Sequence, residues 1–337
     1  PRQSQEVMIS TVLKRTVQIL LALGCIAALW VLTRPGMSEV GIPYAEPAPD
    51  NAPLTVTWLG IATLLIDDGT TQIMTDGFVS RPSLLDLLLR RPIITDVDAV
   101  GEVIEAHGID RLAAIMPVHS HYDHAMDTAD FARLAGADIL GSETTANIAR
   151  SSSFDESRMV TVEPGQTYTY GLFHITFYES RHAPLASNSA IEGVVDAPFK
   201  LPAPYTSWKE GASYAIHIEH PQGVILVVGS AGFVPGVLDD VKADVVFLGT
   251  GGLMTLDSAY LSDYIDETVV TVGAEDVIII HHDDLLGEFG NVEQSRILPS
   301  FDKTSALNLQ QLVLPARLTQ PVFGVPIAID SAPPVTP

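Results

Sequence analysis

The feature that most constrains this sequence is the segment HSHYDH at positions 119–124, directly after the apolar run LAAIMPV. The apolar run predicts a buried strand. In an extended segment alternate residues share a face, so His119 and His121 can point at one ion. Asp123 and His124 follow at a turn, where a helix is expected to begin. The cluster therefore predicts a metal site at the end of a strand.

The donor types in this cluster narrow the choice of metal. Imidazole nitrogen with some carboxylate oxygen and no thiolate suits zinc best, with iron and manganese as alternatives. The only cysteine is Cys25, so the chain has neither a thiolate metal site nor an intrachain disulfide. A chance run of surface histidines is the competing interpretation, but the dense spacing directly after a strand favours a metal site.

The HSHYDH segment resembles the HxHxDH signature of the metallo-β-lactamase superfamily at all four signature positions. The resemblance implies an α/β fold, a four-layer αββα sandwich, over residues 54–330. It also implies that His119 and His121 hold a first metal ion and that Asp123 and His124 hold a second.

Two later histidines extend the ligand set by the same resemblance. His182 follows a strand expected at 173–178 and matches the third histidine of the first site. His281 follows the apolar run 277–280 and matches a second-site ligand, with His282 as the alternative one residue away. The implied ligands of one or two zinc ions are His119, His121, Asp123, His124, His182 and His281.

Two further residues are candidates for supporting roles. Asp76 follows a short apolar run, where superfamily members commonly carry an aspartate that could orient a ligand histidine; a simple turn residue is the alternative. Ser230 is the main departure, because members generally carry a metal-bridging aspartate at this position. A neutral hydroxyl removes a negative charge from between two cations, so we expect weaker binding of the second ion. Ser230 is instead a candidate catalytic residue that hydrogen-bonds bound water or substrate.

The reaction that the resemblance implies is hydrolysis, in which a zinc-bound hydroxide attacks an ester-type bond. Asp123 is a metal ligand or a general base, two roles that exclude each other at any moment. The sequence looks most similar to the branch with lactonases and N-acyl phosphatidylethanolamine phospholipase D. This implies a lipophilic ester, phosphodiester or phospholipid, with a small lactone as the alternative. A hypothesis of another class is a non-catalytic, membrane-tethered binding protein with a degenerate metal site, which Ser230 favours.

The N-terminal segment 16–33 carries no charge and follows Lys14 and Arg15. This pattern predicts a transmembrane helix that anchors the chain, with a cleaved signal sequence as the alternative. Positive charges before the segment favour a cytoplasmic N-terminus and a catalytic domain on the periplasmic or extracellular side. We therefore divide the chain into a stub and anchor (1–33), a proline-rich linker that acts as a tether (34–53), the hydrolase-like domain (54–330) and a flexible tail (331–337).

Charge and two unusual segments bear on partners. The net charge of −23 argues against nucleic acid, because a phosphate backbone would be repelled. The expected partners are a small-molecule or lipid substrate and a membrane, contacted through the N-terminal helix. The sequence does not determine the oligomeric state. The leucine-rich stretch 80–91 could face lipid or an acyl substrate, although core packing is the default expectation. The long irregular segment 183–211 after His182 is expected to form a wall of the substrate pocket.

Overall fold

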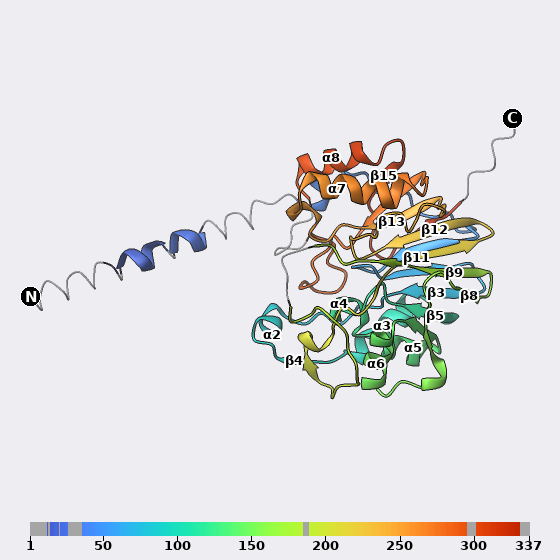
Figure 1. The fold of residues 1–337 in the computed structure, drawn as a ribbon, viewed down its shortest axis with the longest axis horizontal. Coiled ribbons are helices and arrows are strands. Elements are labelled where there is room, and N and C mark those ends of the chain that lie inside the picture. The colour runs from blue at the N-terminus through green and yellow to red at the C-terminus, as the bar shows by residue number, and fades with distance from the viewer. Residues whose placement is uncertain are drawn as a thin grey trace, which may run out of the picture.

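Two mixed β-sheets pack face to face and carry helices on their outer faces, as Figure 1 shows. The computed structural model describes residues 12, 14–19, 21–25, 36–184, 189–294 and 301–330. The four layers are those of the αββα sandwich that the sequence resemblance implied.

The first sheet combines strands from both ends of the domain. Its order is β16 (Pro326–Ala328), β1 (Thr55–Trp58), β2 (Leu64–Asp67), β3 (Gln72–Thr75), β5 (Leu112–Met116), β6 (Asp138–Gly141) and β7 (Met159–Thr161). Strands β16 to β3 are antiparallel, and β3 to β7 are parallel. A tight turn at Asp68-Gly69 joins β2 to β3, and Gly69 takes the positive φ of 81° that such a turn requires.

The second sheet repeats this division into a parallel and an antiparallel half. Its order is β15 (Arg317–Thr319), β14 (Asp276–Ile280), β13 (Val245–Gly249), β12 (Gly223–Val228), β11 (Ser213–His220), β9 (Phe173–Ser180) and β8 (Thr167–Tyr170). Strands β12 to β15 are parallel, while β8, β9, β11 and β12 alternate in direction. The carboxyl ends of β9, β12, β13 and β14 therefore lie at one edge of the sheet.

Each sheet has its own helices. The first is covered by α3 (Val97–Ala106), α5 (Thr128–Ala135) and α6 (Glu143–Ser151), and the second by α7 (Ser258–Ile265) and α8 (Lys303–Leu312). A π-helical segment, η5 (Asp266–Val270), continues α7. One further short helix, α4 (Tyr122–Ala125), lies between β5 and α5 and carries part of the HSHYDH segment.

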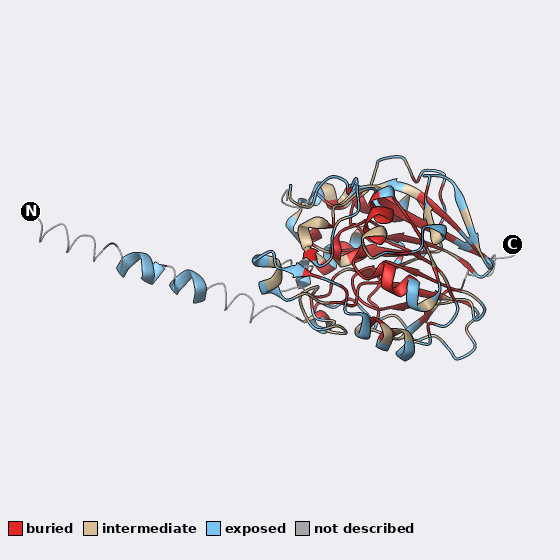
Figure 2. Ribbon diagram, turned by 90° about the horizontal axis from the view of Figure 1, so that it is seen from below, coloured by how far each residue is buried: buried red, intermediate tan, exposed pale blue. Residues whose placement is uncertain are grey.

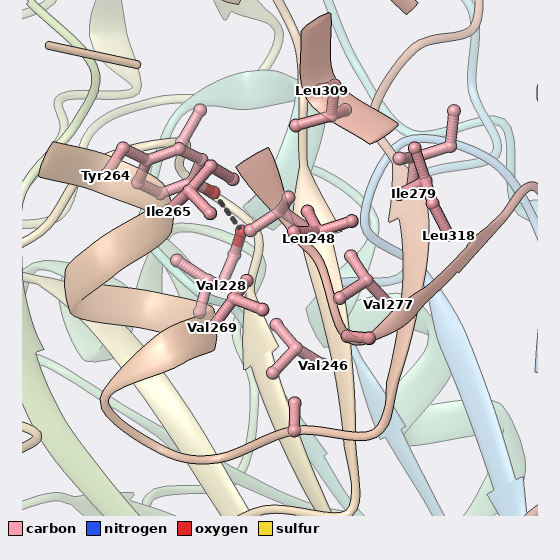
Figure 3. Close-up of a cluster of buried hydrophobic side chains, with 14 of the residues drawn as sticks. Val228, Val246, Leu248, Tyr264, Ile265, Val269, Val277, Ile279, Leu309 and Leu318 are labelled. Atoms are coloured by element: carbon pink, nitrogen blue, oxygen red, sulfur yellow. Dashed lines mark hydrogen bonds between the residues drawn. The ribbon is translucent and has the colours of Figure 1, made fainter. Parts of the chain in front are cut away.

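The core is layered in the same way, and Figure 2 shows buried residues running through the strands and the inner faces of the helices. All five residues of β13 are buried, because this parallel strand is covered on both faces. Its Phe247 faces the layer between the sheets, whereas Val246 and Leu248 face α7 and α8. In that outer layer the Tyr264 hydroxyl donates a hydrogen bond to the Val228 carbonyl at 3.5 Å (Figure 3) and shares it with the Gly249 carbonyl at 3.0 Å.

The proline-rich segment that we expected to be a tether packs against the domain from residue 36 onward. It contains a single turn of 3-10 helix, η1 (Met37–Glu39), and Val40 and Ile42 are each only 3% exposed in the outer core of the second sheet. The Gln320 side chain donates a hydrogen bond to the Ile42 carbonyl at 2.6 Å. Prolines exclude regular structure here, but the apolar side chains between them still gain free energy by burial.

At the N-terminus, residues 14–19 and 21–25 are helical. Within the described part of the chain, none of the helices has the length and apolar character needed to cross a membrane. The remainder of the predicted anchor, including residues 26–33, and the predicted tail 331–337 lie outside the described residues.

The leucine-rich stretch forms a short helix, α2 (Leu84–Leu88), that begins with a capping box between Ser83 and Asp86. The default expectation of core packing is wrong for most of it. Only Leu87 packs against buried residues, and the four other leucines are between 43% and 68% exposed. Five residues are too few for the apolar pattern alone to show which face is covered.

The segment after β9 folds over one end of the sandwich. Its short strand β10 (Ala203–Pro204) pairs with β4 (Pro92–Ile93), which follows α2. Trp208 is buried in the same cluster as Ile93 and Tyr122. The described part of residues 183–211 is therefore ordered over the end of the sandwich that bears the HSHYDH segment.

Candidate metal centre

The histidines and the aspartates singled out in the sequence meet at the carboxyl ends of several strands. HSHYDH follows β5, Asp76 follows β3, His182 follows β9, and His281 follows β14. The carboxyl ends of neighbouring parallel strands lie together, so residues far apart in sequence share one edge of the sandwich. The arrangement contains two separate groups of potential metal donors, and each group contains three residues.

The first group is His119, His121 and His182, whose donor nitrogens all lie within 4.8 Å of one another. Nε2 of His119 is 2.9 Å from Nδ1 of His121, so these two nitrogens face a common point. Burial lowers the pKa of His119 well below its usual value and that of His121 to about 3. Both rings are therefore neutral near pH 7, the form that binds a metal ion.

Each ring of the first group has a partner for its other nitrogen. Nδ1 of His119 lies 2.8 Å from the Ser230 hydroxyl, and Nε2 of His121 donates to the Ile191 carbonyl at 3.3 Å. Nδ1 of His182 donates to the Ala183 carbonyl at 3.0 Å. Such outer hydrogen bonds fix the ring orientation and the tautomer of metal-binding histidines. The nitrogens that remain free to bind a metal ion are Nε2 of His119, Nδ1 of His121 and Nε2 of His182.

The second group is Asp123, His124 and His281. Nε2 of His124 is 3.2 Å from Nε2 of His281, and Asp123 Oδ2 is 3.6 Å from each of them. Burial raises the pKa of Asp123, but the neighbouring histidines outweigh burial and the net shift is downward. The group thus offers two imidazoles and one carboxylate to a common point.

Asp76 orients His124. Its Oδ2 accepts a hydrogen bond from Nδ1 of His124 at 2.6 Å, and its Oδ1 accepts one from the Val118 amide at 2.9 Å. Burial alone would lower the pKa of His124, but the carboxylates of Asp76 and Asp123 outweigh it and raise that pKa. Of the two roles considered for Asp76, the contacts are those of a ligand-orienting residue.

The geometry separates His281 from its neighbour. His281 projects toward His124, and burial lowers the pKa of His281 to about 4. Its backbone has a positive φ of 57°. His282 points the other way and stacks on Trp58 with 4.9 Å between ring centroids. The structure therefore brings His281, and not His282, into the second group.

The glycine-rich segment 249–252 at the end of β13 packs closely against the second group. A Cβ atom on Gly251 would lie 2.7 Å from Nδ1 of His281, so the ring packs directly on this backbone. A Cβ atom on Gly249 would lie 2.6 Å from the Gly229 carbonyl. The glycines allow neighbouring strand ends to approach closely at the site.

Ser230 contacts a histidine of the first group and lines the pocket. Ser230 is only 4% exposed, and its hydroxyl is hydrogen-bonded to the ring of His119. A hydroxyl can accept from Nδ1–H of His119, which leaves Nε2 of that ring with a lone pair for a metal ion. The predicted partner of Ser230 was bound water or substrate, and the partner that the structure shows is the ring of His119.

A pocket of about 220 Å³ opens onto both groups. Besides His121, Asp123, His182 and His281, its lining includes Ser230 and the apolar or aromatic residues Tyr122, Ile191, Ala231 and Leu285. A larger groove of about 450 Å³ lies at the amino ends of β13 and β14, beside Asp244 and Asp276. The donor groups and the first pocket, and not the larger groove, therefore define the candidate site.

Sequence reasoning missed two contacts around the pocket. The Ile191 carbonyl has no side-chain signal, because any residue carries it. Arg81 pairs with Asp283 at 3.4 Å, with both side chains almost fully buried, and Asp283 also accepts a hydrogen bond from the Ile61 amide. The negative charge of Asp283 is thus balanced by an arginine 202 residues away in the sequence.

Comparisons with solved structures identify the fold. The chain is similar to Igni18, a metallo hydrolase from the archaeon Ignicoccus hospitalis, with a TM-score of 0.50 and 13% identity over 83% of this chain and 99% of that one. The metallo-β-lactamase fold protein YhfI of Bacillus subtilis has a TM-score of 0.48 and 14% identity over 81% of this chain and 98% of that one. The diiron β-hydroxylase CmlA of Streptomyces venezuelae has a TM-score of 0.49 and 13% identity over 85% of this chain and 55% of that one.

Neither a protein-family model nor a curated protein sequence matches this chain. At the identity found for Igni18, the structural similarity establishes the fold alone. Together with the layered sheets, it shows a mixed α/β, metallo-β-lactamase-like fold. The expected fold class is confirmed to that extent.

Proposed function

We propose that this chain is a metal-dependent hydrolase of the metallo-β-lactamase superfamily that cleaves an ester-type bond. The observation that carries the proposal is the convergence of two three-residue donor groups on one pocket. Metal donors that face an accessible pocket, and not a closed interior, are typical of catalytic sites. The fold shared with Igni18, described as a metallo hydrolase, is consistent with this function.

The donor chemistry fits zinc. The first group offers three neutral imidazoles, and the second offers two imidazoles and a carboxylate; zinc accepts both sets, and iron or manganese accepts the second. Three protein ligands leave one position of a four-coordinate ion open. Zinc in such a site supplies Lewis-acid chemistry and lowers the pKa of a water ligand to about 7.

Three residues around the donor groups have distinct roles in the proposed reaction. Asp123 lies at the pocket as a carboxylate, with its pKa held down by the surrounding histidines despite burial. It can complete the second ligand group or accept the proton of an attacking water, but not both at one moment. Ser230 keeps His119 in one orientation, and Asp76 does so for His124.

The pocket walls favour a substrate with an apolar portion. Tyr122, Ile191 and Leu285 line the pocket beside the donors, and apolar walls with few polar groups are typical of sites for small organic ligands. We propose a lipophilic ester, phosphodiester or phospholipid as the substrate class, with a small lactone as the alternative. We further propose that the N-terminal segment holds the domain at a membrane, on the periplasmic or extracellular side.

The test combines metal analysis with a substrate panel. The full chain is stripped with a chelator and reconstituted separately with zinc, iron and manganese. Each form is then assayed on aryl esters of increasing chain length, bis-aryl phosphodiesters and lactones. We expect zinc-dependent turnover that increases with acyl length. Turnover that is unchanged in the metal-free protein, or no turnover with any metal, would contradict the hydrolase.

A His121→Ala variant separates metal-dependent turnover from background. His121 contributes a donor to the first group and makes an outer contact to Ile191. We expect the variant to lose both bound metal and turnover, while a His174→Ala control, altered on an exposed residue of β9, keeps both. If the protein binds metal and substrate but never turns over, the alternative of a binding protein with a degenerate site replaces the hydrolase.

A further inference from the structure

We infer that α2 docks this protein onto a phospholipid bilayer that contains anionic lipid, with the metal pocket on the same side of the molecule. The inference concerns a surface and does not depend on hydrolysis by the pocket. We define the leucine patch as the four residues Leu84, Leu85, Leu88 and Leu89.

The patch exposes an unusual amount of apolar surface. The exposed fractions are 43% for Leu84, 60% for Leu85, 68% for Leu88 and 60% for Leu89. Pairs four residues apart lie on one side of a helix, so the four leucines share a face, while Leu87 turns inward to the buried cluster around Trp208. Grouped exposed leucines on a soluble domain are characteristic of an interaction surface.

The charges beside the patch favour an anionic surface as the occupant. Arg90 and Arg91 follow the last leucine directly and are exposed, in a chain whose net charge is −23. The one acidic residue within α2, Asp86, pairs with Arg91 at 3.5 Å. Because anionic lipid attracts basic side chains that lie next to apolar ones, Arg90 and Arg91 favour this face for contact with such lipid.

Contacts at the start of α2 connect the patch with the metal pocket. Arg81, two residues before the capping residue of α2, pairs with Asp283 at 3.4 Å. Asp283 and Leu285 line the metal pocket, and Leu285 packs in the same cluster as Leu87. The leucine patch and the pocket therefore lie on one side of the molecule.

The path of the N-terminal chain agrees with this orientation. The first described residue of the domain is Gly36, three residues after the uncharged stretch 16–33, and three residues span at most about 10 Å. Gly36 lies against Glu293, because a Cβ atom on it would be 2.8 Å from that carboxylate. The Glu293 carbonyl accepts from the Asp284 amide, and Arg81 donates to the Asp284 carbonyl at 3.5 Å. One loop thus joins the point of chain entry to α2, so the membrane attachment proposed above for the N-terminal segment, on which this step rests, would bring α2 to the bilayer.

The experiment uses the full chain with Cys25→Ser, so that an engineered cysteine is the single labelling site. A nitroxide is attached at Leu88→Cys and, as a matched control, at Leu172→Cys. Leu172 is 54% exposed in the turn between β8 and β9, at the edge opposite α2 in Figure 1. The protein is reconstituted with phosphatidylcholine vesicles with and without phosphatidylglycerol, and collision rates with oxygen and with a water-soluble nickel chelate are measured.

We expect the label at position 88 to collide preferentially with oxygen, and the label at position 172 to collide preferentially with nickel. Three results would each overturn the proposal: no binding to the vesicles, equal behaviour at the two positions, or shielding of position 88 from both reagents, as in a contact with another copy. Adding R90Q and R91Q should abolish the effect of phosphatidylglycerol on position 88. Persistence of the full effect would exclude the arginines as its source.

Discussion

Asp76 accepts a hydrogen bond from Nδ1 of His124 at 2.6 Å, and both side chains are fully buried. The carboxylate thereby directs Nε2 of His124 toward His281 and Asp123. Since Asp76 is held in turn by the Val118 amide, the orientation of the second donor group depends on a residue that does not touch the pocket.

Replacement of Asp76 by asparagine should weaken the second site selectively. Asp76 accepts hydrogen bonds from His124 and from the Val118 amide. The NH₂ group of an asparagine cannot accept, so one of these two hydrogen bonds is lost. We expect zinc affinity at the second site to fall about 10-fold to 100-fold, with a smaller change at the first. Chelator competition measures both. Asp110→Asn, on a side chain that is 72% exposed, is the control; equal losses at the two sites would contradict the assignment.

Replacement of Ser230 by aspartate should strengthen binding of the second ion. The hydroxyl of Ser230 contacts His119 from the strand end where superfamily members place their bridging carboxylate. A carboxylate there adds negative charge near both groups, and we expect a gain of about tenfold, or about 1.4 kcal/mol. Zinc stoichiometry after equilibrium dialysis measures the gain. A stoichiometry and affinity identical to those of the native chain would show that the side chain at this position does not reach the second group.

Replacement of Gly251 by alanine should displace His281. The new Cβ atom would lie 2.7 Å from Nδ1 and 3.0 Å from the carbonyl oxygen of His281, and real Cβ atoms do not approach so closely. We expect loss of second-site metal with the first site retained, detected by cobalt absorption spectra. Gly101→Ala in α3 is the matched control, because nothing lies within 4 Å of its Cβ position. Cobalt absorption at both sites in Gly251→Ala, as in the native chain, would contradict this packing.

The metal-free protein should lose stability as pH falls below about 6.5. Burial lowers the pKa of His121 to about 3 and that of His281 to about 4, so between these values and 6.5 these two side chains bind more protons in the unfolded chain than in the folded one. The contribution of these two histidines to stability is therefore fully present above pH 6.5, their pKa in the unfolded chain, and decreases on acidification. Between pH 6.5 and 5 each group contributes a loss of about 2 kcal/mol. Urea unfolding of the chelated protein measures it, and His121→Asn should reduce the slope; an unchanged slope would contradict the shift.

The sequence was most informative where a pattern is local. The alternation of a strand was enough to pair His119 with His121. His182 and His281 came from the family resemblance, because a single histidine after a buried run is more often structural. The structure brings all of them together at one edge because their strands end there. The layered fold could be expected from the family resemblance, since composition and periodicity do not distinguish an αββα sandwich from other α/β arrangements.

Contacts between distant residues were beyond the reach of the sequence. The pairing of Arg81 with Asp283 depends on two loops that meet only in the folded chain. The exposure of Leu88 depends on what α2 packs against, which a five-residue apolar pattern does not show. The same holds for the burial of Val40, which follows from its packing in the outer core of the second sheet and not from its proline-rich neighbours.

The carbonyl of Ile191 receives hydrogen bonds from His121 and from the Glu210 amide, while the Ile191 side chain lines the pocket. One residue thus belongs at once to the substrate enclosure and to the support of a metal ligand. A change that moves the backbone of this wall would therefore also move a hydrogen-bond partner of His121. Under the proposed function, variants that broaden the pocket at Ile191 should therefore be screened for metal binding as well as for turnover.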